Sequence, residues 1–114
     1  MPEKCYFIIG FCIWKFYVGF LRYHSIGENA SVDFDFEAVM AQKCLLGWYH
    51  SHPEDIKEPS ETDDKTMGTW VRAMGKPLLC GIISDIQNCY IYDRSGRKHI
   101  ESILLGNIFF AWKL

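Results

Sequence analysis

Residues 44–63 decide the fold of this chain, and they read CLLGWYHSHPEDIKEPSETD. The stretch opens with an apolar run, which predicts a buried strand over 44–49. Pro53 ends the extended segment, because proline cannot donate a backbone hydrogen bond to a neighbouring strand. His50 and His52 therefore lie where the strand leaves the core, and a charged loop follows them.

A helix is predicted over residues 60–74. Ser60 is a typical N-cap residue, and Gly75 lies just beyond the predicted end. One face of this helix is apolar at the spacing of helical turns, and it consists of Met67, Trp70, Val71 and Met74.

The residues before this unit predict two strands and a short helix. Aromatic and β-branched residues favour strands at about 5–11 and 14–21, with Gly10 and Gly19 as breaks. The polar residues 23–31 predict a loop. Residues 35–42 favour a short helix, although part of this segment also alternates like a strand.

Three further strands are predicted after the helix, over 78–84, 89–93 and about 98–105, with a turn at 93–96 between the last two. Strands interleaved with one or two helices predict an α/β fold, with a mixed sheet packed by helices. The length of 114 residues suits a single domain over 1–114.

Composition and charge exclude several classes of protein. The chain carries a net charge of -2, so it has no basic surface typical of nucleic-acid or acidic-membrane binding. Lys15 interrupts the apolar residues 5–21 and Glu3 precedes them, which disfavours a signal peptide or a membrane span. Five cysteines without a C-x-x-C pair fit a cytoplasmic, reducing location.

His50, His52 and Asp63 form a candidate metal site. Side chains two residues apart on an extended segment point to the same face, so both imidazoles can bind one ion. Asp63 follows after a loop, in the first turn of the predicted helix, and can add a third ligand. Two imidazoles and one carboxylate with an open position are typical of catalytic zinc, which makes a bound water acidic near neutral pH.

Structural explanations of the same residues remain open. Ser60 and Asp63 also form the pattern of a capping box, which many helices carry for stability alone. The two histidines would then be surface residues beside a turn, and Glu3 an exposed terminal residue.

The spacing His50-Ser51-His52-Pro53, six residues, Ser60, two residues and Asp63 resembles the H-x-H-P-x6-S-x-x-D signature of the JAMM (MPN+, JAB) metalloproteases. The lead-in 47–49 is similar to that family as well. So are the predicted strands after the helix, at 77–84 and 90–93. Upstream, residues 3–10 resemble the family's E-x-C-G-x-L-x-G segment, with Tyr6 in place of its first glycine.

The resemblance implies a fold, a site and an activity. The fold is a mixed, mostly antiparallel sheet packed by helices, similar to cytidine deaminases and abbreviated at the N-terminus, unless the true start lies upstream of Met1. His50, His52 and Asp63 would bind one Zn²⁺ per chain. Ser60 would stabilise the oxyanion and Glu3 would be the general base, with Glu28 as the fallback.

The family cleaves amide bonds, chiefly isopeptide bonds at the carboxyl terminus of ubiquitin-like proteins, and compact bacterial relatives resemble this chain in size. The partner expected from the resemblance is therefore a protein substrate, a ubiquitin-like conjugate, with no nucleic acid or membrane. Two alternatives stay open: a non-catalytic MPN scaffold that binds a partner protein, and a metallo-amidohydrolase of small substrates.

Overall fold

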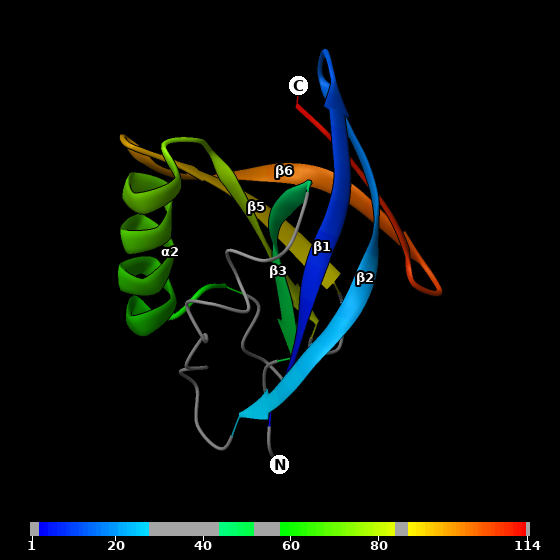
Figure 1. Cartoon of the computed structure of the whole chain (residues 1–114), viewed down its shortest axis with the longest axis horizontal. Coiled ribbons are helices and arrows are strands. Elements are labelled where there is room, and N and C mark those ends of the chain that lie inside the picture. Colours follow the sequence, from blue (N-terminus) through cyan, green and yellow to red (C-terminus); the bar gives the residue numbers. More distant parts are fainter. Residues whose placement is uncertain (1–2, 28–43, 52–57, 84–86, 114) are drawn as a thin grey trace.

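The structure is a computed structural model that describes residues 3–27, 44–51, 58–83 and 87–113. Its elements in chain order are β1 (Glu3–Ile13), β2 (Phe16–Gly27), β3 (Leu45–Ser51), α2 (Glu61–Met74), β4 (Leu78–Ile83), β5 (Gln87–Asp93), β6 (Gly96–Leu105) and β7 (Ile108–Trp112). Figure 1 shows the strands curving around one another, with α2 on one side of them.

The strands close into a barrel in the order β1-β2-β7-β6-β5-β4-β3. β3 and β4 pair in parallel, and every other neighbouring pair is antiparallel. A parallel pair needs a crossover between its strands, and here the crossover contains α2. The prediction of a mixed, mostly antiparallel sheet with a helix is thus confirmed in outline, whereas closure into a barrel was not predicted.

Two apolar clusters stabilise the barrel, one on each side of its wall. The first lies between the barrel and α2, and its central contact joins Trp48 of β3 to Trp70 of α2, with ring centroids 5.8 Å apart. The second fills the barrel interior, where the rings of Tyr49 and Phe109 pack in a T-shaped arrangement with their centroids 5.7 Å apart. Trp48 and Tyr49 are neighbours in β3 but belong to different clusters, because successive side chains of a strand point to opposite sides.

β1 and β2 differ from the prediction in their glycines. Gly10 and Gly19 do not end the strands but face each other inside the β1–β2 ladder. A Cβ atom at Gly10 would come within 2.0 Å of the Val18 carbonyl oxygen. The glycines therefore permit close approach of the two backbones at this point, a role that glycine also has inside strands.

Other boundaries differ because pairing partners extend the strands. β2 continues through Gly27, so the predicted loop is wrong for residues 23–27, which pair with the start of β1. β7 was not predicted, although it closes the barrel between β2 and β6. The helix predicted over 35–42 lies outside the described residues. The predicted helix over 60–74 is confirmed as α2, with Ser60 as its N-cap.

All five cysteines are free, as predicted. Cys5, Cys80 and Cys89 are buried, while Cys12 and Cys44 are exposed. Within the described parts of the chain, no helix is long and apolar enough to cross a membrane.

We expect two of the five thiols to react rapidly with Ellman's reagent at pH 8, because burial raises the pKa of Cys80 and Cys89 and the thiolate is the reactive form. The count is read from the rapid absorbance phase of the native protein, and unfolding in guanidinium should release all five. Replacing Cys12 and Cys44 by serine should abolish the rapid phase. A rapid phase of three or more thiols would contradict this arrangement of the core.

Candidate functional site

The end of β3 and the first turn of α2 lie against each other. His50 is the penultimate residue of β3 and Asp63 the third residue of α2. Both are buried, with 5% and 7% of their surfaces exposed, and His50 Nε2 lies 3.3 Å from Asp63 Oδ2. The structure thus brings together two residues that the sequence analysis assigned to one metal site.

Local structure explains why Asp63 occupies this position. Its backbone N–H donates to Ser60 Oγ at 3.1 Å, and the Ser60 N–H donates to Asp63 Oδ2 at 2.8 Å. This reciprocal pair is the capping box expected from the sequence, and a carboxylate is also favourable at a helix N-terminus. Asp63 therefore serves the helix and faces His50 with the same carboxylate.

Strand geometry explains the position of His50. It lies two residues after Trp48, so both side chains are on the side of β3 that faces α2. Trp48 is fully buried against Trp70 of the helix. Packing of these two indoles holds β3 and α2 at the separation that places His50 beside Asp63.

The pair of donors fits a zinc ion. Two ligands of one tetrahedral zinc, each bound at about 2.0–2.1 Å, are separated by roughly 3.3 Å. The observed distance between His50 Nε2 and Asp63 Oδ2 is 3.3 Å, which is compatible with a shared zinc ion and also with a direct hydrogen bond. His52, the third predicted ligand, lies outside the described residues, and within those residues no group of three metal-binding side chains occurs.

Ser60 lies beside this pair and is partly buried. Its Oγ accepts a hydrogen bond from Asp63 N–H, which leaves the hydroxyl hydrogen able to donate to another oxygen. The Ser60 hydroxyl therefore lies next to an imidazole and a carboxylate, and its role as oxyanion stabiliser stays a prediction.

Glu3 is the first residue of β1, and its side chain lies outside the described part of the structure. The backbone around it is placed by β3: Cys5 pairs with His50, and the Lys4 N–H donates to Ser51 Oγ at 2.8 Å. The start of β1 therefore runs beside the end of β3 that carries His50. The fallback base Glu28 lies outside the described residues.

The thiol of Cys80 is buried near this site but is not available as a nucleophile. Cys80 pairs with Trp48 across the parallel β3–β4 ladder and is fully buried. Burial, and secondarily the negative charge of Asp63, raise the pKa of this thiol well above its usual range. It stays protonated and belongs to the core.

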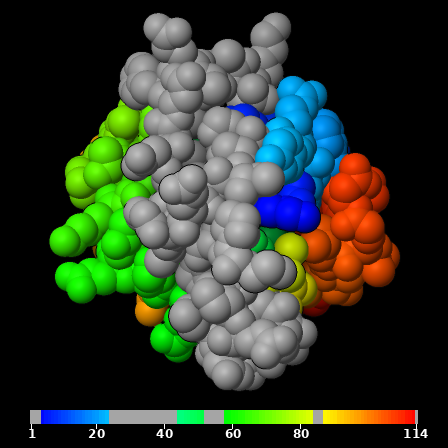
Figure 2. Space-filling view, turned by 90° about the horizontal axis from the view of Figure 1, so that it is seen from below, coloured from blue at the N-terminus to red at the C-terminus, as the bar shows by residue number. Residues whose placement is uncertain are grey.

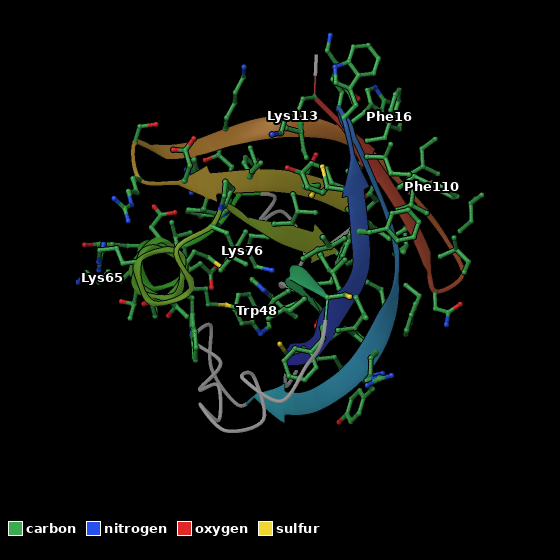
Figure 3. All side chains as sticks on the ribbon, turned by 45° about the horizontal axis from the view of Figure 1, so that its top comes forward. Phe16, Trp48, Lys65, Lys76, Phe110 and Lys113 are labelled. Atoms are coloured by element: carbon green, nitrogen blue, oxygen red, sulfur yellow. The ribbon has the colours of Figure 1, made fainter. Side chains whose placement is uncertain are left out.

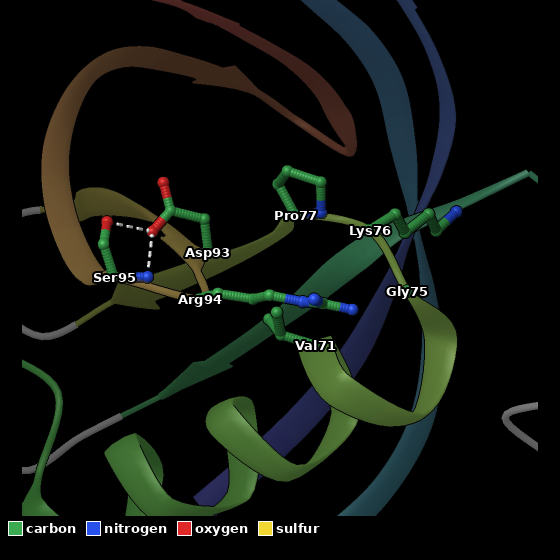
Figure 4. Close-up of a pocket in the computed structure, with 7 residues that line it drawn as sticks. All are labelled: Val71, Gly75, Lys76, Pro77, Asp93, Arg94 and Ser95. Atoms are coloured by element: carbon green, nitrogen blue, oxygen red, sulfur yellow. Dashed lines mark hydrogen bonds between the residues drawn. The ribbon is translucent and has the colours of Figure 1, made fainter.

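A separate cavity of about 380 Å³ lies at the other end of α2 (Figure 4). It is lined by Val71, Gly75, Lys76, Pro77, Asp93, Arg94 and Ser95. The helical rise of about 1.5 Å per residue places its lining residues Val71 and Gly75 about 12–18 Å along α2 from Asp63. Its carboxylate, Asp93, accepts hydrogen bonds from the Ser95 hydroxyl and N–H, and these lower its pKa. Asp93 thus shapes the β5–β6 turn, and the lining contains no imidazole or thiol.

A polar network that was not predicted from the sequence holds the start of α2. Arg97 of β6 donates to the Pro59 carbonyl at 3.0 Å and to Asp64 Oδ1 at 2.9 Å. The Tyr92 hydroxyl donates to the same Asp64 oxygen at 2.5 Å. Pro59 and Asp64 flank the segment that contains Ser60 and Asp63. The only local sign of this network in the sequence is Asp64, the acidic residue next to Asp63. Its partners Tyr92 and Arg97 come from strands that are distant in the sequence.

We expect Arg97→Ala to lower the free energy of unfolding by about 1–2 kcal/mol, since it removes charge-assisted hydrogen bonds that are partly exposed to solvent. Urea unfolding followed by circular dichroism measures the change. Lys98→Ala, at the next and exposed position of β6, is the matched control and should change stability by less than about 0.5 kcal/mol. Equal effects of the two substitutions would show that the network does not stabilise the start of α2.

Comparison with known proteins identifies the family. Residues 3–97 match the family model described as prokaryotic homologs of the JAB domain. No curated protein and no solved structure matches the chain. The matched residues include β1 to β5, α2 and the whole segment from His50 to Asp63. The resemblance inferred from that segment is confirmed, and the chain belongs to the family of prokaryotic homologs of the JAB domain.

Proposed function

We propose that this protein is a zinc-dependent peptidase of the JAMM type, which hydrolyses an amide bond at the carboxyl terminus of a ubiquitin-like protein conjugate. The observation that carries the proposal is the buried pair of His50 and Asp63, with 3.3 Å between imidazole nitrogen and carboxylate oxygen. Membership of the JAB family supports it. One Zn²⁺ per chain is proposed, with His52 as the third ligand.

Burial and fixed orientation of the two donors support the proposed metal site. The carboxylate of Asp63 is almost fully buried, and the imidazole of His50 lies within hydrogen-bond distance of it. The Ser60 N–H provides one partner and fixes the carboxylate oxygen nearest to His50. A pair of ligands that is already oriented loses little freedom when it binds a metal, which favours affinity.

The chain's own groups have distinct roles in the proposed reaction. His50, His52 and Asp63 hold the ion, which when bound would supply a Lewis acid and a water that loses its proton near neutral pH. Ser60 donates its hydroxyl hydrogen to the oxygen of the scissile carbonyl as negative charge develops there. Glu3 accepts a proton from the attacking water and passes it to the leaving amine.

The rigid start of α2 matters for this chemistry. Oxyanion stabilisation depends on a donor that is in place before the charge develops. Ser60 is held by its capping bonds with Asp63, and Arg97 holds the preceding Pro59 carbonyl. The polar network from β5 and β6 thus supports the position of the proposed donor.

We expect purified protein to contain about one zinc per chain and Asp63→Asn to contain less than about a tenth of that, since an amide is a far weaker zinc ligand than a carboxylate. Inductively coupled plasma mass spectrometry measures the content. His99→Ala is the matched control, because this histidine is exposed on β6 and contacts Asn88 and Tyr90 instead. Zinc-free protein with an intact circular dichroism spectrum would contradict the metal site.

We expect ubiquitin linked through its carboxyl terminus to a fluorescent amine to be hydrolysed, with loss of activity on addition of 1,10-phenanthroline. Ser60→Ala should lower kcat by about 10²–10³ and Glu3→Gln by about 10² or more. Ser60→Thr is the control, because threonine keeps both the cap and the hydroxyl. Bound zinc with no hydrolysis of conjugates would favour the scaffold, and hydrolysis of small amides alone would favour the amidohydrolase.

A further inference from the structure

The barrel has an apolar outer surface on the side away from α2. We define the outer face by the outward-pointing apolar residues of four neighbouring strands: Phe11 and Ile13 of β1, Phe16, Val18 and Phe20 of β2, Ile108 and Phe110 of β7, and Ile103 and Leu105 of β6. Figure 3 shows Phe16 and Phe110 at the far side of the barrel from Lys65 on α2. Figure 2 likewise shows the orange part of the chain, which includes the β6–β7 turn, on the side opposite α2.

The ladder makes this face continuous. Phe11 pairs with Val18, Val18 pairs with Phe110, and Phe110 pairs with Ile103. Directly paired side chains on one face are about 5 Å apart, so these four residues form an unbroken row across the strands. The parallel row from Phe20 through Ile108 to Leu105 adjoins it.

The inward side of the same strands is apolar as well. Tyr17, Phe109 and Ala111 point into the barrel and are buried, while their neighbours belong to the outer face. Strands that are apolar on both sides are typical of sheets covered on both sides. α2 covers the opposite part of the barrel, against β4 and β5, and does not reach this face.

The size of the outer face fits a protein interface. Eight of its side chains are 37–64% exposed. With roughly 200 Å² per large apolar side chain, they present about 800 Å² of apolar surface. That exceeds the largest patch of a typical monomer and equals the contribution of one partner to a standard interface. The described strands form a closed barrel, so none of them offers a free edge for a partner to extend.

Two side chains of opposite charge, Arg22 and Glu101, lie at the border of the outer face. Arg22 follows Phe20 along β2, and Glu101 precedes Ile103 along β6, at the opposite end of the strands. Both are exposed and mark diagonally opposite corners. A twofold axis in the plane of the interface, perpendicular to this diagonal, places Arg22 of one copy opposite Glu101 of the other.

We propose that the outer face is the interface of a homodimer, in which the barrels of two copies of this chain pack face to face. The two paired rows, from Phe11 to Ile103 and from Phe20 to Leu105, are not interrupted by an ionisable side chain, which is typical of homodimer interfaces more than of transient complexes. The diagonal charges then set the orientation of the two copies. The dimer is independent of the proposed zinc site, which lies on the α2 side of the barrel.

Sedimentation velocity of the full chain from about 1 to 100 μM tests the proposal. We expect a species of twice the 13.3 kDa chain mass, in reversible exchange with the monomer. Phe110→Glu, at the centre of the face, should raise the dissociation constant at least about thirtyfold. Leu105→Glu, at the most exposed position, should do the same with less effect on folding. Lys65→Glu on α2 is the control for an added negative charge.

A charge swap tests the orientation and the identity of the partner together. Arg22→Glu and Glu101→Arg should each raise the dissociation constant about three- to tenfold, and the double variant should restore it. Only self-association predicts this rescue within one chain. A monomer at every concentration would overturn the proposal, as would a dimer unaffected by Phe110→Glu and Leu105→Glu in folded protein. Monomer that floats with phosphatidylcholine–phosphatidylserine vesicles would overturn it and assign the face to a membrane.

Discussion

The capping box at the start of α2 is the interaction on which the site depends. The carboxylate of Asp63 accepts a hydrogen bond from the Ser60 N–H and so caps the first turn of the helix. The same carboxylate lies 3.3 Å from His50 Nε2. A helix that began one residue earlier or later would rotate this carboxylate by about 100° and remove it from β3. The position of the helix start is therefore a condition for the site, and the polar network of Arg97 and Tyr92 holds that start from the other side.

Much of this site could be predicted because its determinants are local in the sequence. The buried strand, the histidine at its end and the N-cap lie within residues 44–63, so strand alternation and capping preference suffice to place them. The pairing of His50 with Asp63 needed one further step, the packing of Trp48 against Trp70. That step follows from two apolar residues on the facing sides of a predicted strand and a predicted helix.

The rest of the fold depends on long-range pairing that local patterns do not contain. Residues 23–27 are polar and looked like a loop, yet they form strand because β1 pairs with them. β7 closes the barrel only because β2 and β6 present pairing partners on both sides. Arg97 reaches Pro59 across 38 residues of sequence. Each of these depends on tertiary contacts, and in residues 23–27 those contacts override local propensity.

The barrel explains why residues 5–21 are so apolar. Alternate residues fill the interior, and the others form the outer face or pack beneath α2. The segment is apolar over most of its length because it forms two strands with apolar surfaces on both sides. The proposed metal site and the outer face both lie on the outside of the barrel, on opposite flanks. Substitutions on the two sides are separated by a packed core and share no partner, so their effects on zinc content and on association should be additive.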